Sequence, residues 1–262
     1  GWMMMKVRFG MWDEILTFEP PTCKQVKNSY CSLIATMHYA RGVAFAATGK
    51  VAQAKEEHKK LRSLMKLEFL IKYFSLFKNR MVVVPTDEKE ENYTPGSLNV
   101  ADAVLDGEIA YREAVLNEGK DPNTFDKAFA LLRKAVWLDD HLHYDEPWGW
   151  MMPSRHALGA LLLEQKRYQE AVTSLREDLG ELIPDTWDEA KEGVFYNKHP
   201  NNLWALRGLS KAYRKMGKEE EAKEAEERLQ KAAARCDVAA SGSDVPTCYC
   251  ATKSLKEANK SA

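Results

Sequence analysis

Apolar residues recur along this chain at helical spacing, and the helices that they predict come in pairs. Between 28 and 48, apolar side chains lie three or four residues apart, which favours a helix with one buried face (Leu33, Met37, Ala40, Ala44). Gly49 ends this helix, and a second helical pattern starts near Val51. Similar patterns predict further helices in four ranges: 100–116, 122–138, 153–179 and 200–234.

Three of these helix pairs share one spacing. A small residue is followed seven positions later by a turn residue, and an alanine comes five positions after that: Gly42, Gly49 and Ala54; Gly159, Lys166 and Ala171; Ser210, Gly217 and Ala222. This spacing is typical of a helical-hairpin repeat of about 34 residues. We therefore predict an all-α fold of the tetratricopeptide type, in which stacked hairpins form a right-handed superhelix.

The spacing also predicts how the chain is organised. We expect a helical solenoid over 28–235, and a second half of one more repeat within 1–20, with Gly10 at its turn and Ile15 in the alanine slot. The second repeat has a turn about nine residues longer than the others, before Asp121. The repeats lie near 28–77, 98–138, 153–180 and 200–234, the insertions at 78–97 and 180–199, and an extended or partly disordered tail at 236–262.

Six separate segments together resemble the C-terminal half of large, mostly bacterial, tetratricopeptide-repeat proteins. They occur in this order along nearly the whole chain: RFGMWDEIL (8–16), HYARGVA (38–44), YDEP (144–147), RHALG (155–159), REDL (176–179) and NLWAL (202–206). Longer members of the family carry further repeats upstream, so the resemblance implies that this chain is the C-terminal part of a longer protein. It implies a fold and no particular reaction.

Composition excludes several classes of function. The net charge is −1, so no overall field attracts nucleic acid or an anionic membrane. No apolar run is long enough to span a membrane. The five cysteines are few and odd in number, which argues against a disulfide framework and predicts a reducing compartment such as the cytoplasm.

The segment 141–156, HLHYDEPWGWMMPSRH, is the strongest candidate for a ligand site. It joins aromatic rings to a few polar groups, which is the composition of many ligand pockets. In the repeat register His156 points into the concave groove, so the segment's polar and aromatic side chains could converge there (Tyr144, Asp145, Glu146, Trp148, Trp150, Arg155, His156). Alternatively the tryptophans pack between repeats, and Asp145 or Glu146 pairs with Arg155.

A transition metal is a sharper version of this hypothesis. His141, His143 and His156, with Asp145 or Glu146, would supply the nitrogen and oxygen ligands that zinc, copper or iron accepts. Cys248 and Cys250 could add thiolates from the tail, although nothing in the sequence places them near a histidine.

A basic stripe on the first helix of the fourth repeat is the second candidate. Trp204, Arg207, Lys211 and Arg214 share one face, which the repeat register turns toward the groove. Such a face could hold a carboxylate by charge-assisted hydrogen bonds, or it could simply be solvated. The two-carboxylate clamp of chaperone-binding repeats is absent.

The sequence thus predicts a binding or scaffold module that recognises a peptide, a partner protein or a small ligand through its groove and segment 141–156. The partner could also be an upstream part of the same protein. The alternative is an enzyme or metal-binding protein with its site at the histidine, tyrosine and carboxylate cluster of 141–156.

Overall fold

The computed structural model describes residues 2–22, 31–74, 96–117, 122–142 and 150–235, and within these ranges every regular element is a helix. The described residues divide into two compact units, the first ending at Met152 and the second starting at Pro153. Adjacent helices pack in pairs within each unit, as a helical repeat requires. Most of the predicted 78–97 insertion and the tail at 236–262 lie outside the described residues.

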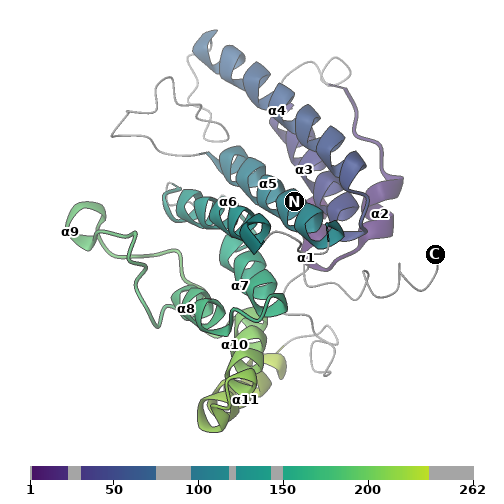
Figure 1. Ribbon diagram of the computed structural model, residues 1–262. Helices are drawn as coiled ribbons and strands as arrows, with labels where there is room; N and C mark the ends of the chain where they lie inside the picture. Colours follow the sequence, from purple (N-terminus) through teal and green to yellow (C-terminus); the bar gives the residue numbers. More distant parts are fainter. Residues whose placement is uncertain (1, 23–30, 75–95, 118–121, 143–149, 236–262) are drawn as a thin grey trace. The chain divides into compact units, whose positions relative to one another are not determined.

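The first unit has six helices in its described part. Two short helices, α1 (Trp2–Arg8) and α2 (Trp12–Thr17), pack on α3 (Cys31–Ala47), which pairs with α4 (Val51–Phe74). The second pair consists of α5 (Ser97–Leu116) and α6 (Pro122–Asp140). Helix α5 contacts both α3 and α4, and Figure 1 shows α5 lying between α4 and α6. The second pair is therefore seated on the first.

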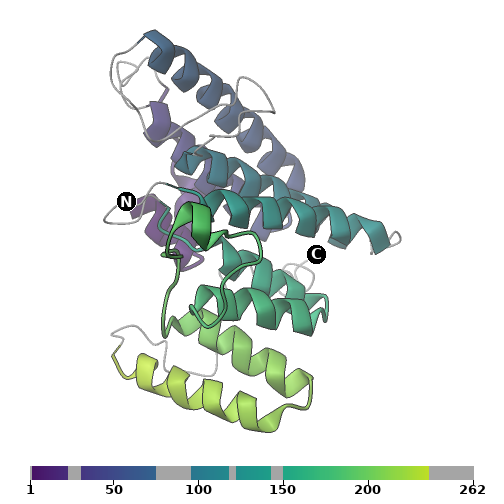
Figure 2. The same cartoon turned by 90° about the vertical axis from the view of Figure 1, so that its left-hand side faces the viewer.

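The second unit repeats this arrangement. Helices α7 (Ser154–Glu164) and α8 (Tyr168–Asp178) form one pair, and α10 (Leu203–Lys215) and α11 (Glu219–Ala233) form the other, side by side in Figure 2. Helix α10 contacts both α7 and α8. The Asn202 side chain caps α10 by accepting hydrogen bonds from the amides of Trp204 and Ala205. A buried core joins α8, α10 and α11, with Leu175, Leu206 and Leu209 among its members.

The predicted turn residues share one backbone conformation. Gly49, Lys166 and Gly217 all have positive φ, between 60° and 76°. In each turn the next amide bonds back to the carbonyl five residues earlier, as from Lys50 N to Phe45 O at 2.8 Å. This is the Schellman ending, which satisfies carbonyls that a helix end leaves without a partner. The turn positions predicted from the spacing are confirmed.

The small residues lie where paired helices approach most closely. A Cβ added to Gly107 would lie 2.7 Å from Leu132 Cγ, and one added to Gly159 would lie 2.8 Å from Leu175 Cδ2. Atoms cannot approach to these distances, so the leucine side chain or its helix would have to shift. The alanine-slot residues Ala54 and Ala171 are also completely buried.

One prediction about the second repeat was wrong. The expected long turn before Asp121 is only the segment 117–121, compared with 48–50 and 165–167 in other pairs. The extra residues instead lengthen α5 and α6. In longer helices the backbone N–H and C=O groups bond to one another, whereas in a long loop these groups would have to form hydrogen bonds with water.

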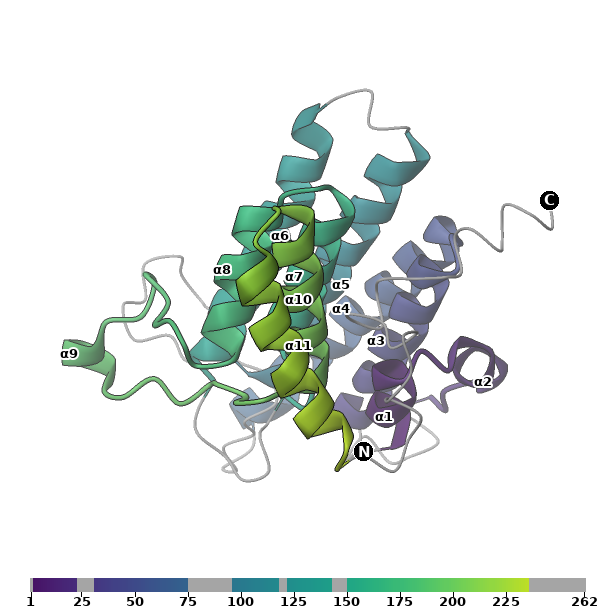
Figure 3. The same cartoon turned by 90° about the horizontal axis from the view of Figure 1, so that it is seen from below.

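The insertion at 180–199 has structure of its own. It contains the short helix α9 (Glu189–Glu192), which lies at the outer tip of this loop in Figure 3. Trp187 and Phe195 are buried, with ring centroids 5.3 Å apart, and Trp187 Nε1 donates to the Gly193 carbonyl at 2.9 Å. The predicted connector therefore has a small aromatic core.

We predict that Gly107→Ala lowers the free energy of unfolding by about 1–2 kcal/mol, because crowding against Leu132 exceeds the gain in helix propensity. Leu132→Ala alone should cost about 2–5 kcal/mol. The double variant should lose less than the two single losses combined, because the shorter side chain admits the new methyl group. Urea denaturation measures all three, and simple additivity would contradict the contact.

Candidate functional site

Histidine–carboxylate pairs join successive helices in both units. His38 Nδ1 of α3 lies 2.6 Å from Glu57 Oε2 of α4, and His58 Nε2 of α4 lies 2.6 Å from Asp102 Oδ1 of α5. Burial alone would raise the pKa of Glu57, but hydrogen bonds and charge from His38 and Lys60 outweigh it and lower the pKa to about 2. Both carboxylates are thus held ionised by their partners across helix interfaces.

The most enclosed of these groups is in the second unit. Asp178, at the end of α8, receives His156 Nε2 from α7 at 2.8 Å and His199 Nδ1 from the end of the insertion at 3.0 Å. The His199 amide also donates to the Asp178 carbonyl at 2.6 Å. Burial would raise the pKa of the Asp178 carboxyl, but the charge and hydrogen bonds of the two histidines hold it well below its usual range. One carboxylate thereby connects three segments.

The predicted orientation of His156 toward an open groove was wrong. Its side chain is 0% exposed, because its position on α7 faces the neighbouring helix α8 and the Asp178 carboxylate. Arg155 is also buried: its Nε donates to Glu177 Oε2 at 3.1 Å, and its guanidinium lies over the Phe195 ring. Both side chains hold α7 to α8 and to the insertion.

The rest of segment 141–156 divides between packing and residues outside the described ranges. Trp150 is buried against Tyr39, with ring centroids 5.1 Å apart, as the packing alternative expected. His141 stacks on Trp137 at 4.2 Å and bonds its carbonyl. Outside the described residues lie the other predicted members of the site: His143, Tyr144, Asp145, Glu146 and Trp148. Their predicted ligand role stays a prediction.

The metal hypothesis gains no support from the described residues, among which no three histidine, cysteine or carboxylate side chains form a group that could hold a metal ion. His156 is instead engaged by Asp178, in the same unit. The other predicted ligands His143, Cys248 and Cys250 lie outside the described ranges.

The predicted basic stripe on α10 is partly neutralised by α11. Arg214 Nη2 lies 3.3 Å from Glu226 Oε2, and Arg207 Nη1 lies 4.0 Å from Glu226 Oε1. Trp204 packs against the core of the second unit. Lys211 is exposed to solvent. Because the two arginines share a carboxylate of their own chain, the stripe offers a ligand less charge than the sequence predicted.

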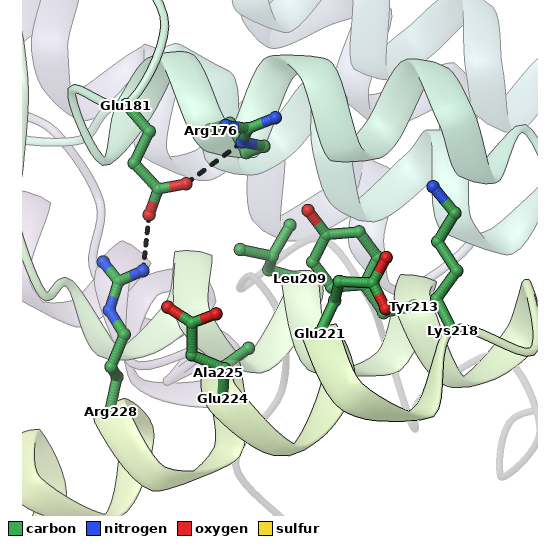
Figure 4. Close-up of a pocket in the computed structure, with 9 residues that line it drawn as sticks. All are labelled: Arg176, Glu181, Leu209, Tyr213, Lys218, Glu221, Glu224, Ala225 and Arg228. Carbon is green, nitrogen blue, oxygen red and sulfur yellow. Dashed lines mark hydrogen bonds and ion pairs between the residues drawn. The ribbon is translucent and has the colours of Figure 1, made fainter.

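Each unit has a groove of the same construction, between the second helices of successive pairs and over the first helix of the later pair. In the second unit this α8–α11 groove encloses about 560 Å³ and is drawn in Figure 4. Its cations Arg176 and Arg228 both bond Glu181, at 3.1 and 2.5 Å, while Glu221 and Glu224 face it from α11. With its arginines already paired and charges of both signs, this groove favours no single ligand charge.

The corresponding groove of the first unit is more basic. This α4–α6 groove encloses about 690 Å³ and is lined by twelve residues from α4, α5 and α6: Lys55, His58, Lys59, Arg62, Ser63, Lys66, Asp106, Ile109, Ala110, Glu113, Lys127 and Leu131. Ile109 is buried, while Ala110 and Leu131 are half-buried. The groove therefore combines apolar contact surface with cations from two helices.

The cations of the α4–α6 groove fall into two groups. Arg62 donates to Asp102 at 2.6 Å and to Asp106 at 3.0 Å, and Lys55 pairs with Glu113. Lys59, Lys66 and Lys127 are exposed and make no ion pair within the described residues. These three ammonium groups are available to an anion that enters the groove.

Sequence reasoning missed this groove because its cations come from helices of two different repeats. Lys59 and Lys66 are seven residues apart and thus share a helical face, which was a usable signal. Nothing in the sequence placed Lys127 across from them, since that requires the packing of α4 and α6 on α5.

We predict that Asp178→Asn lowers the free energy of unfolding by roughly 3 kcal/mol at pH 7, because it breaks a buried ionic cluster. The folded-state pKa of Asp178 lies below its value in the unfolded chain. This stabilisation is therefore complete above about pH 4 and is lost as the pH falls toward the folded-state pKa. The difference between wild type and variant should accordingly shrink below pH 4.

Guanidinium denaturation from pH 3 to 7 measures this difference. Asp185→Asn is the matched control, because Asp185 is exposed in the insertion that follows α8. An equal loss in both variants, or a difference that grows on acidification, would contradict the role of Asp178.

Comparison with known proteins adds no assignment. The chain was compared with protein-family models, with curated proteins and with solved structures, and none of these comparisons gives a match. Among the described helices none is both long and apolar enough to cross a membrane. Over its described residues the chain is all-helical, and adjacent helices pack in pairs as in a helical repeat.

Proposed function

We propose that this chain is a protein-binding module of the tetratricopeptide-repeat type that holds an acidic segment of a partner protein in the α4–α6 groove. The observation that carries the proposal is the set of three exposed lysines, Lys59, Lys66 and Lys127, which lie along an apolar floor and make no ion pair with any residue that the structure describes. The paired helices and their common turns support the repeat type.

The energetics favour recognition by several weak contacts. A single exposed ion pair contributes only about 0–1 kcal/mol, because water and salt screen it. Three lysines acting on one ligand add their contributions, and Ile109, Ala110 and Leu131 offer apolar surface beneath them. Like-signed charges in a groove also raise the rate of encounter with an oppositely charged partner. The groove thus suits an acidic peptide bound reversibly.

Catalysis has no comparable support. The histidine–carboxylate pairs lie across helix interfaces, where His58 and His156 are buried and each bonds a carboxylate of another helix. A catalytic pair needs a substrate within reach of the imidazole. Of these pairs only His58 lines the α4–α6 groove, and its Nε2 atom is already bonded to Asp102.

We predict that a fluorescently labelled peptide of alternating glutamate and alanine binds the full chain and that Lys59→Glu/Lys66→Glu weakens binding by roughly tenfold or more, since two attractive contacts become repulsive. Raising the salt concentration should weaken binding by the wild type as well. Fluorescence anisotropy titrations measure both effects, and circular dichroism confirms that the variant is folded.

The control variant Lys50→Glu/Lys215→Glu changes the net charge by the same amount at exposed lysines outside the groove lining. It should retain wild-type affinity. A control variant that loses as much affinity as the groove variant, or a glutamine-containing peptide that binds as well as the acidic one, would refute the proposed site.

A further inference from the structure

Helix α11 presents a row of carboxylates to solvent. Ala222, Ala225 and Leu229 bury one face of this helix. At 100° per residue the opposite face carries the exposed residues Glu220, Glu224 and Glu227, of which Glu224 also borders the α8–α11 groove. None of the three makes an ion pair within the part of the chain that the structure describes. Other exposed carboxylates without ion pairs there, such as Asp13, Glu56 and Asp185, occur singly.

The acidic row has the same spacing as two lysine rows, one on α4 and one on α6, although Lys134 of the second row lies beyond the residues that line the groove. Glu220 and Glu227 are seven residues apart, as are Lys59 and Lys66 on α4 and Lys127 and Lys134 on α6. Seven residues of helix span about 10 Å, so each row places its outer charges at matching distances. Lys134 is exposed and makes no ion pair within the described ranges. A helix laid along the groove could therefore meet lysines on both sides.

We propose that the occupant of the α4–α6 groove is helix α11 of a second copy of this chain. The inference rests on the proposed function, because it uses the same groove. The acidic face of α11 and the basic groove belong to different surfaces of the molecule, so the contact is heterologous, and each copy can accept one neighbour and be accepted by another. A net charge of −1 places little overall repulsion between copies. The result is head-to-tail association.

The exposed face of α11 offers charge and no apolar anchor, since it consists of three carboxylates, Glu220, Glu224 and Glu227, and two lysines, Lys223 and Lys231. Association is therefore held mainly by ion pairs and depends on salt. We expect the average mass of the full chain to rise with concentration above the monomer value of 29.8 kDa in about 50 mM salt. It should return toward that value in about 500 mM salt.

Two neutralising variants test the contact from its two sides. Lys59→Gln/Lys66→Gln removes charge from the groove, and Glu220→Gln/Glu224→Gln removes charge from α11. Each should weaken self-association by roughly tenfold. Their equimolar mixture should give a heterodimer that grows no further, because only one intact groove and one intact α11 face can meet. Sedimentation velocity measures the masses. Glu56→Gln/Asp185→Asn is the control and should associate like the wild type.

The results separate this inference from the proposed function. A wild type that stays monomeric at low salt but binds the acidic peptide overturns head-to-tail association and leaves the groove proposal standing. Self-association that is as strong in either variant as in the wild type, or a mixture that stays monomeric, also overturns the inference. If neither peptide nor a second copy binds, both proposals fail.

Discussion

Close contact between neighbouring helices, within pairs at Gly107 and Gly159 and between pairs at Gly42, is the constraint on which the rest of this structure depends. At Gly42, Gly107 and Gly159 a neighbouring leucine lies so near that a single added carbon would collide with it. Two helices at this separation pack their remaining side chains in register, which fixes where the next pair can sit. Positive φ at Gly49 and Gly217 lets the chain reverse direction after α3 and after α10, the first helices of their pairs.

Within this arrangement of helices, buried and partly buried ionic groups join neighbouring elements rather than form an open reactive site. Asp178 joins α7, α8 and the end of the insertion through two histidines, and the partly exposed Asp102 joins α5 to His58 and Arg62 of α4. Removing one partner from such a group would leave a buried charge without compensation, so these groups specify which surfaces meet. Their demand for pairing also explains why they cannot serve as an open ligand site.

Binding capacity is found where charge is not consumed internally. In the α8–α11 groove Arg176 and Arg228 bond Glu181, and the charges without an ion pair within the described residues are of both signs: Lys218, Glu221 and Glu224. In the α4–α6 groove the cations Lys59, Lys66 and Lys127 make no ion pair within those residues. Grooves of the same construction thus differ in what they can recognise. The contrast rests on a few surface residues, which can vary without disturbing the glycine and alanine contacts beneath them.

The sequence by itself determined the paired long helices and the turns at Gly49, Lys166 and Gly217, because helical period, small residues and left-handed turn positions are local properties of the chain. Tertiary structure decided which charged side chains remain open. His156 was expected in a groove and is buried on Asp178, and Arg207 of the predicted basic stripe faces Glu226. Lys127 faces the same groove as Lys59 only because α4 and α6 pack on α5. A charged residue's partner depends on helices distant in sequence, so local pattern places the residue on a face but cannot say what that face meets.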